Sequence, residues 1–477
     1  MTATQPKSFQ HASFQGQIGI ARADITPPVG VYARNWGAAK HDVADSIHRP
    51  LTLTALAIAA AETQSEPLVL VDADLGWWKT PGTFSEFHRR VVTALSLDPT
   101  RFIFALSHTH AGPPLMQPDP SLPGSDLLQA WMEELVETTI ETIRQACASK
   151  FPATLDWHSG QCSLASQRDL PDPRVGPTLS SPTSSPTDSQ AHYLCGYNPA
   201  GTPDQTLLVG RISDAQGNIR GTLVNYACHP TTLAADNTAI SPDYVGAMRD
   251  TIEQVTSAPA LFLLGMCGDL APRFQYVGKP AVADRHGRQL GYAALATLQD
   301  MEPVGSSLEF CSVLESGAPL AVWQHKSRKL SQRLQAVRAN VPLALKAWPA
   351  ADELERQRLA CTDRALEERL RRRRDIRRGI GDGDSYQITI DAWRIGDAVL
   401  VGSCCEPYSF LQQELRHRFA DSTLICMNLI NGSIGYLPPA ALYDADVYPV
   451  WQTPFERGSL ERVLEACTGA IKNVLDS

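Results

Sequence analysis

The chain has 477 residues, of which 43% are hydrophobic and 19% are charged, with a formal net charge of −9. This length allows a large buried core, and the negative charge argues against nucleic acid as the main partner, because phosphate binding needs a basic surface. Since the sequence has neither the apolar core of a signal peptide nor a run of about 18 apolar residues, we expect a cytoplasmic protein without a membrane span.

Hydrophobic patterning in the first third of the chain predicts strands that alternate with helices. Residues 16–30 should form a strand closed by a Pro-Pro turn, and residues 66–78 contain the continuous apolar run of a strand buried on both faces. A helix is expected from about Thr83 to Leu97, and residues 101–114 should form a buried strand that runs into a Gly-Pro loop. Apolar residues at helical spacing predict a further helix from Ser125 to Ala148.

The rest of the chain continues this pattern after one polar interruption. The segment from Thr178 to Gln190 is rich in serine, threonine and proline, which indicates a flexible surface insertion. Apolar strands that each end in a loop then follow within residues 221–233, 260–274, 397–410 and 422–439. Since helices separate several of these strands, we predict an α/β fold with a mixed β-sheet core flanked by helices.

The expected organisation is one domain over residues 18–477, preceded by a disordered tail at residues 1–17. A helical insertion is predicted at about residues 325–380, as a hairpin in which Ala351 to Arg378 form one long helix. Seven arginines fall between Arg369 and Arg378. They indicate either a solvated helix face with Glu–Arg pairs one turn apart or a rim that binds an anionic partner or substrate.

The eleven cysteines indicate the redox state of the protein. They are scattered along the chain, none lies in a CxxC pair, and the adjacent Cys404 and Cys405 are poorly placed to bond to each other. We therefore expect reduced and mostly buried thiols, as in a cytosolic protein.

Metal-binding or ionisable residues recur where the apolar strands end. In open α/β folds, ligands bind outside the carboxyl ends of strands, so residues in these loops can converge on one site. The residues in question are His108, His110, His229, Asp269, Glu406 and Tyr436. Each is a modest signal alone, and the prediction of a site depends on their combination.

The first of these signals is the triplet His108-Thr109-His110. If the strand continues through the triplet, residues two apart point to the same face, and both imidazoles face one cavity. Neutral imidazole is the commonest protein ligand for metal ions. The alternative is a pair of hydrogen-bonded loop histidines.

His229 and Glu406 each have a structural explanation as well as a functional one. Taken alone, His229 is more readily explained as a structural histidine than as a ligand. Glu406 ends a long apolar run, where an unpaired charge is costly. Its partner is either the start of a helix near Ser409 or a metal ion.

The motifs along the chain, in this order, resemble those of the neutral ceramidases. HTHAGP at residues 108–113 is similar to the family's HTHSGP, and ACHPTTL at residues 227–233 is similar to its HPTSM segment. GDLAPR at residues 268–273 resembles GDVSPN, and NLINGSIGYLPP at residues 428–439 resembles the motif NxYxxYVTT. The resemblance runs from about Ile18 to the end of the chain. It implies a neutral-ceramidase-like catalytic domain without the C-terminal immunoglobulin-like domain of longer members.

The resemblance implies a role for individual residues. One zinc ion per chain would be held by His108, His229, Glu406 and Tyr436. His110 would lie beside the metal, Tyr448 would be a further active-site tyrosine, and Arg168 matches a family arginine by a looser alignment. We also expect Asp74 to support the ligands from behind. The loop tryptophans expected near the site are Trp36, Trp77 and Trp78.

The sequence departs from the family's pattern at the nucleophile. The family's proposed nucleophilic serine is Ala271 here, Arg273 stands in place of an asparagine, and Ser433 replaces the first tyrosine of NxYxxY. Zinc lowers the pKa of bound water to about 7, which would supply hydroxide without a serine. His110 or Asp269 would then take the proton of the water.

The resulting prediction is a zinc-dependent hydrolase that cleaves an amide bond of a small-molecule substrate with a metal-activated water. Tyr436, Tyr448 and Arg168 would stabilise the developing oxyanion. Two alternatives stay open, namely a zinc hydrolase acting on a carbohydrate, ester or lactone, and a non-catalytic binding protein on the same scaffold. Lipid-like and carbohydrate substrates are both compatible with the sequence, and the ligand set would also accept manganese or iron.

Overall fold

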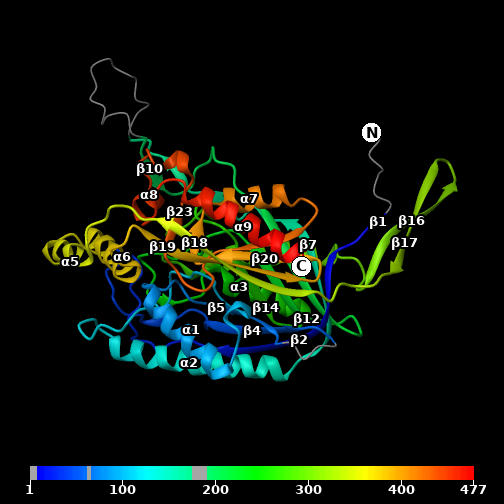
Figure 1. The fold of residues 1–477 in the computed structure, drawn as a ribbon, viewed down its shortest axis with the longest axis horizontal. Helices are drawn as coiled ribbons and strands as arrows, with labels where there is room; N and C mark the ends of the chain where they lie inside the picture. The colour runs from blue at the N-terminus through cyan, green and yellow to red at the C-terminus, as the bar shows by residue number, and fades with distance from the viewer. Residues whose placement is uncertain (1–7, 62–65, 175–190, 477) are drawn as a thin grey trace, which may run out of the picture.

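The computed structural model of the protein describes residues 8–61, 66–174 and 191–476. In these ranges two large β-sheets stack face to face, and helices cover their outer faces (Figure 1). The architecture is α/β with mixed sheets, which confirms the predicted fold class. The predicted insertion at 178–190 lies outside the described residues.

The larger sheet has eight strands. In sheet order they are β14 (Ala260–Leu264), β12 (Ile219–Tyr226), β11 (Thr206–Asp214), β7 (Phe151–Gln161), β2 (Ala12–Asp24), β4 (Thr52–Ala59), β5 (Leu68–Ala73) and β6 (Phe102–Leu106). The pairs β5–β6 and β12–β14 are parallel, with Val71 opposite Phe104 and Val224 opposite Phe262, and the other pairs are antiparallel. Every residue of β5, β6 and β14 is buried, as their continuous apolar runs predict.

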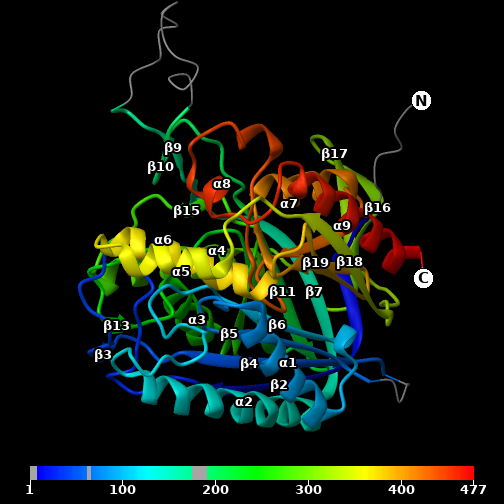
Figure 2. The same cartoon turned by 60° about the vertical axis from the view of Figure 1, so that its left-hand side comes forward.

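Four helices cover the outer face of this sheet. They are α1 (Pro81–Leu95), α2 (Ser125–Ala148), α3 (Tyr244–Thr256) and α4 (Pro280–Gln299). Helix α2 lies along β2 and β4 (Figure 2) and has the predicted bounds. Helix α1 starts two residues before the prediction, because Thr80 caps it by accepting a hydrogen bond from the Thr83 N–H.

The second sheet packs its inner face on the first. It consists of β18 (Leu334–Ala344), β19 (Ser385–Ile395), β20 (Ala398–Ser403) and β22 (Thr423–Met427). Phe14 and Leu56 of the first sheet share one core with Trp393 and Leu400 of the second. Helices α7 (Ser409–Arg418) and α9 (Ser459–Asp476) belong to a separate core on the outer face.

Short strand pairs hold the loops together at the edges of these layers. They are β3 (Ser46–Ile47) with β13 (Ala239–Ile240), β8 (Ala165–Gln167) with β15 (Leu270–Pro272), β9 (Asp169–Pro171) with β10 (Tyr193–Cys195), and β21 (Cys405–Pro407) with β23 (Gly435–Leu437). Two 3-10 turns, η1 (Pro99–Arg101) and η3 (Ala440–Leu442), and the short helix α8 (Tyr448–Gln452) complete the connections.

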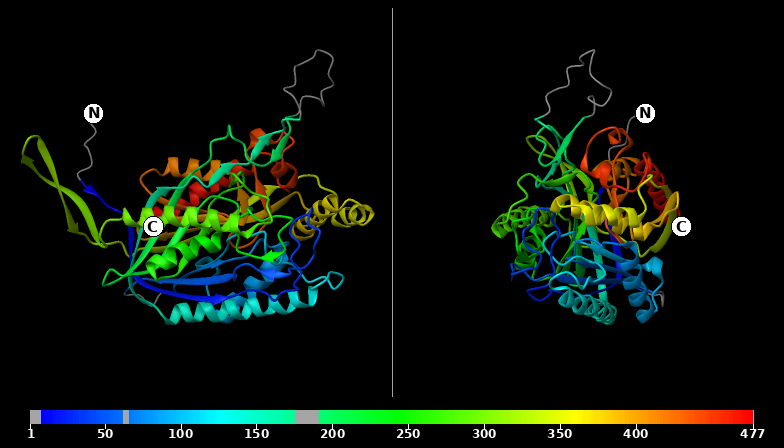
Figure 3. Two further views of the ribbon diagram at one scale, coloured as in Figure 1. Left: turned by 180° about the vertical axis from the view of Figure 1, so that it is seen from behind. Right: turned by 90° about the vertical axis from the view of Figure 1, so that its left-hand side faces the viewer.

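A three-stranded arm projects from the end of the molecule opposite to α5 (Ala351–Ala360) and α6 (Arg364–Ile380) (Figures 1 and 3). The arm is formed by β1 (Ser8–Phe9), β16 (Ser306–Glu315) and β17 (Pro319–Ser327).

Three predicted boundaries are wrong. Residues from Ser8 onward form strands, so the part of the expected N-terminal tail that the structure describes is ordered. The expected helical hairpin after Trp323 begins instead with strands β17 and β18. The expected long helix is two helices, because Asp363 adopts an extended conformation and caps α6 by accepting from the Leu366 N–H at 2.7 Å.

No helix in the described ranges is both long enough and apolar enough to cross a membrane. All eleven cysteines lie in these ranges as free thiols, and most of them are buried.

Candidate metal centre and active site

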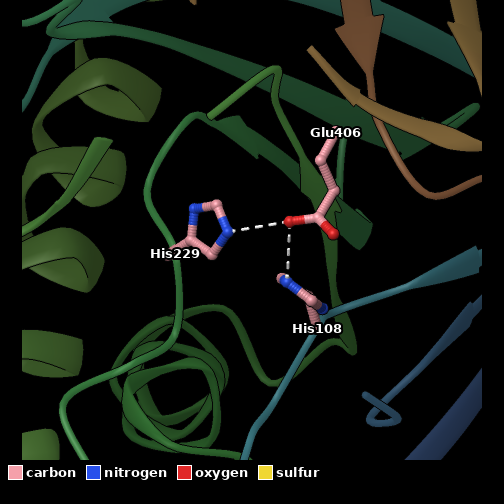
Figure 4. A group of neighbouring side chains, drawn as sticks. All are labelled: His108, His229 and Glu406. Carbon is pink, nitrogen blue, oxygen red and sulfur yellow. Dashed lines mark hydrogen bonds and ion pairs between the residues drawn. The ribbon is translucent and has the colours of Figure 1, made fainter. Parts of the chain in front are cut away.

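Three of the four predicted metal ligands meet in one buried group (Figure 4). His108 follows β6, His229 follows β12, and Glu406 lies in β21. Glu406 Oε2 is 3.0 Å from His229 Nε2 and 3.3 Å from His108 Nε2. The potential ligand atoms of the three residues all lie within 4.8 Å of one another.

The chain turns sharply at His108. Strand β6 ends at Leu106, and His108 has a φ of +70°, which is uncommon for a residue other than glycine. Its backbone N–H donates to the carbonyl of Leu75 at 2.8 Å, which holds the turn. The expected strand alternation through the triplet is therefore wrong. The turn itself brings His110 Nε2 to 3.4 Å from His108 Nε2.

His229 is fixed by the loop that contains the GDLAPR motif. Its backbone N–H donates to the carbonyl of Leu270 at 3.0 Å, and its Nδ1 lies 2.6 Å from the carbonyl of Cys267. Gly268 allows this loop to approach β21, because a Cβ at this position would lie 2.7 Å from the carbonyl oxygen of Glu406. The motif thus holds a histidine and the glutamate in one place.

Parallel pairing of β21 with β23 places Glu406 opposite Tyr436. The Tyr436 hydroxyl lies 3.5 Å from His229 Nε2, and the side chain is buried. The fourth predicted ligand is therefore adjacent to the other three.

The hydrogen bonds of the two imidazoles fit a bound cation. His108 Nδ1 lies 3.0 Å from the carbonyl of Gly76, and His229 Nδ1 lies 2.6 Å from that of Cys267. Because a carbonyl only accepts, each Nδ1 carries the proton, and each Nε2 of a neutral ring presents a lone pair. Burial lowers the pKa of His229 to about 3, so this ring is neutral near pH 7. Two lone pairs and a carboxylate oxygen then face one another, an arrangement that a metal cation satisfies.

Arg168 and Tyr448 lie beside Tyr436. The Arg168 guanidinium donates to the carbonyl of Gly268 from Nε at 3.1 Å and from Nη2 at 2.7 Å, and it lies 5.4 Å from the centre of the Tyr436 ring. The Tyr448 ring is 5.5 Å from the Tyr436 ring, and its hydroxyl accepts from Arg372 Nη1 at 3.3 Å. Burial is the main reason why the pKa values of both phenols are raised.

His110 lies between two of the predicted tryptophans. The centre of its ring is 5.1 Å from that of Trp36 and 4.7 Å from that of Trp77. Burial, followed by the nearby His108, holds the pKa of His110 well below its ordinary value, so the ring is neutral near pH 7. Trp78 packs in the core against Phe87 at 5.0 Å.

Asp269 is not turned towards the metal ligands. Its carboxylate accepts from the Ser409 N–H at 2.6 Å, from the Ser409 hydroxyl at 2.8 Å and from Gln167 Nε2 at 2.9 Å. These bonds cap the N-terminus of α7, so the expectation that Asp269 could act as the base is not supported by its position.

Asp74 likewise supports the fold instead of the metal ligands. Its carboxylate accepts from Arg249 Nη1 at 2.7 Å and from the Thr52 N–H at 2.9 Å, while Asp72 accepts from Arg249 Nη2 at 2.7 Å. This ion-pair network joins the end of β5 to helix α3. The hydrogen-bond partner of the His108 ring is the Gly76 carbonyl instead of Asp74.

A cavity of about 430 Å³ lies beside the ligand group and is lined by His110, Arg168, Tyr436 and Tyr448. A smaller hollow of about 50 Å³ adjoins it and reaches His108 and Glu406. The lining residues that were not predicted as site residues include Lys79, Tyr276, Arg369 and Arg372. The arginine-rich run had indicated a substrate rim as one alternative, and both arginines belong to it. Nothing in the sequence indicates that Lys79 or Tyr276 lines a site.

Ala271 is buried at the position where the resemblance expects a serine. It lies in β15, opposite Ser166 of β8, and it has no group that can attack a substrate. The aliphatic hydroxyls that line the cavity and the hollow are also engaged, since Thr231 donates to Gln275 Oε1 and Ser433 accepts from the Trp78 N–H.

Solved structures share this fold. A structure described as a ceramidase complexed with C2 superposes with a TM-score of 0.66 and 15% sequence identity, over 97% of this chain and 75% of that chain. The neutral ceramidase of Pseudomonas aeruginosa superposes with a TM-score of 0.65 and 16% identity, over 97% of this chain and 74% of that chain. No family model and no curated protein sequence matches the chain. The similarity confirms the expected ceramidase-like fold.

Proposed function

We propose that this protein is a metal-dependent hydrolase that cleaves an amide bond of a small-molecule substrate. The observation that carries the proposal is the buried group in which His108 Nε2, His229 Nε2 and Glu406 Oε2 face one another at hydrogen-bonding distance while both Nδ1 atoms face carbonyls. The fold shared with ceramidases supports the same reaction class.

These three residues would hold one zinc ion, with the Tyr436 hydroxyl as a fourth ligand. Imidazole nitrogen and carboxylate oxygen are common zinc ligands, and the carbonyls of Gly76 and Cys267 fix the orientation of the rings. When bound, zinc polarises a carbonyl and lowers the pKa of water.

His110 is the proposed base. It is neutral at pH 7, and its Nε2 faces the ligand group at 3.4 Å from His108 Nε2. The ring can therefore accept a proton from a water molecule in the site and return it to the leaving amine. Contacts with Trp36 and Trp77 hold it in place.

Arg168, Tyr436 and Tyr448 supply positive charge and hydroxyl donors on the other side of the site. The two bonds to the Gly268 carbonyl hold the Arg168 guanidinium before substrate binds, so little reorganisation is needed when charge develops on the substrate oxygen. Because position 271 is alanine, water is the proposed nucleophile.

The experiment is hydrolysis of a panel of N-acyl amides, esters and glycosides before and after chelation. We expect amide cleavage that is lost on chelation and restored by added zinc, and lost in Glu406→Gln. A matched control is Glu302→Gln, because Glu302 also faces a histidine, His325 of the projecting arm. Amide cleavage that survives chelation and Glu406→Gln would contradict the proposal.

A further inference from the structure

One face of helix α6 forms part of the wall of the cavity. Four residues of α6 line the cavity of about 430 Å³. They are Ala365 and the residues three, four and seven positions after it, namely Glu368, Arg369 and Arg372. One turn further on, Asp375 lines the smaller hollow that reaches the metal ligands. The substrate therefore meets a charged helix face along this wall.

The charges on this face are only partly compensated. Glu368 is 5% exposed and accepts from Arg372 Nε at 3.0 Å, so these two charges neutralise each other. Arg369 instead lies over the ring of Trp451, 4.7 Å from its centre. Among the described residues, no carboxylate forms an ion pair with Arg369.

Arg168 is a second cation that lines the cavity and, unlike the solvent-exposed Arg369, it is buried. It is 3% exposed, and its Nε and Nη2 donate to the Gly268 carbonyl. In the described part of the chain it too has no carboxylate partner within ion-pair distance. Asp169 and Asp269 lie near enough to interact electrostatically with Arg168, but their carboxylates accept hydrogen bonds from Tyr408 and Ser409 instead. Asp236, which also lines the cavity, is exposed to solvent.

We propose that the substrate is an N-acyl amino acid or a similar amide with a carboxylate, and that Arg369 binds this carboxylate. The inference rests on the proposed amide hydrolysis. With the scissile carbonyl near the metal ligands and Arg168, the carboxylate would lie in the same cavity as Arg369. The Arg369 guanidinium lies over the Trp451 ring, so that its planar fork can face the carboxylate. This geometry suits bidentate binding.

The same wall disfavours a substrate with a long alkyl chain lying along α6. Such a chain would cover the exposed Arg369 guanidinium and remove it from water without replacing its hydrogen bonds. A compact amide with an anionic group instead exchanges water for a charge-assisted pair at Arg369.

The test compares two substrates of equal length, N-octanoylglycine and N-octanoylethanolamine, on the zinc-loaded protein. We expect wild type to prefer the glycine conjugate by about 10-fold or more in kcat/KM. Arg369→Gln should abolish the preference through a higher KM for the glycine conjugate, and Arg369→Lys should restore part of it. The control is Arg378→Gln, an exposed arginine on the last turn of α6 that does not line the cavity, which should keep the wild-type preference.

The outcomes separate the inference from the proposed function. Cleavage of both conjugates with the same preference in wild type and Arg369→Gln overturns the carboxylate site and leaves amide hydrolysis in place. If the zinc-loaded protein cleaves neither conjugate, calorimetric binding of N-octanoylglycine decides. Binding that is at least about 10-fold weaker in Arg369→Gln than in wild type supports the site, and equal or absent binding overturns it.

Discussion

Two walls of the site differ in origin. The strand-end wall lies beside the cavity and is built from the ends of strands, which deliver His108, His229 and Glu406 to a single buried group. The other is a helix face that carries Glu368, Arg369 and Arg372. The strand-end wall gains its geometry from backbone contacts, such as the Gly76 and Cys267 carbonyls, and is suited to chemistry. The helix wall consists of long side chains and is suited to selecting a substrate.

Loss of a strand-end ligand should have the largest effect. In His229→Ala we expect loss of the metal and at least about a 10³-fold fall in kcat/KM, because the metal supplies several kcal/mol of stabilisation. Elemental analysis beside an amide assay measures both. His11→Ala, which removes another buried histidine outside the group, is the control. A variant that loses the metal but keeps its turnover would show that the metal is not catalytic.

Arg168→Gln should have the next largest effect. Removing a preorganised donor to a developing oxyanion typically lowers kcat by about 10² to 10³. The metal content should stay at the wild-type level, since the metal ligands proposed here do not include Arg168. Arg168→Lys keeps the charge but not the two bonds to the Gly268 carbonyl, so an intermediate rate is expected. Equal rates in all three proteins would remove Arg168 from the mechanism.

Acid should weaken the fold through partly buried histidines such as His88 of α1, whereas the arginines of the helix wall stay charged. Burial, followed by the charge of Arg338, lowers the pKa of His88 to about 4. The unfolded chain binds the proton near pH 6.5 and the folded chain near pH 4, so stability is lost as pH falls between these values. After allowance for partial exposure, we expect a loss of about 1 kcal/mol between pH 6.5 and 4.5.

Urea unfolding at several pH values measures this loss. His88→Gln should flatten the profile in that window, while the corresponding variant of the exposed His417 should follow wild type. A profile that is unchanged by His88→Gln would mean that other groups carry the acid sensitivity.

Tyr448→Phe should have a smaller effect on activity. It removes one hydroxyl, which accepts from Arg372, and leaves the ring that packs on Tyr436. One hydrogen bond of this kind corresponds to about a 10-fold loss in kcat. A kcat at the wild-type level would make Tyr448 part of the wall only.

Asp269→Asn should have the smallest effect. The carboxylate caps α7 through Ser409, so we expect a loss of about 1 kcal/mol in the free energy of unfolding, with metal content and most of the turnover retained. Chemical denaturation and the amide assay test this together. Turnover that disappears while stability stays at the wild-type level would restore Asp269 as a candidate base.

The strand-end wall was largely predictable from the sequence for a physical reason. Residues such as His229 and Glu406 end apolar runs, and buried strands place their ends at one edge of a sheet. The turn at His108 was not predictable, because a φ of +70° depends on contacts with the Leu75 and Gly76 carbonyls across the sheet.

The helix wall was less predictable. An arginine-rich helix has the same pattern whether its charges face solvent or a cavity, and only the tertiary contacts distinguish Arg369 from Arg378. The break before α6 did have a signal, since Asp363 is a good N-cap three residues before Leu366. Asp269 was expected in the site because it follows a strand. Its carboxylate instead accepts from the N-terminus of α7.

The most direct test of the metal centre is a crystal structure of the zinc-loaded protein with anomalous diffraction recorded on both sides of the zinc absorption edge. We expect one anomalous peak bound by His108 Nε2, His229 Nε2 and a Glu406 carboxylate oxygen, at distances of about 2.0 to 2.2 Å. No peak among these three atoms, or a peak held by other residues, would contradict the proposed metal centre.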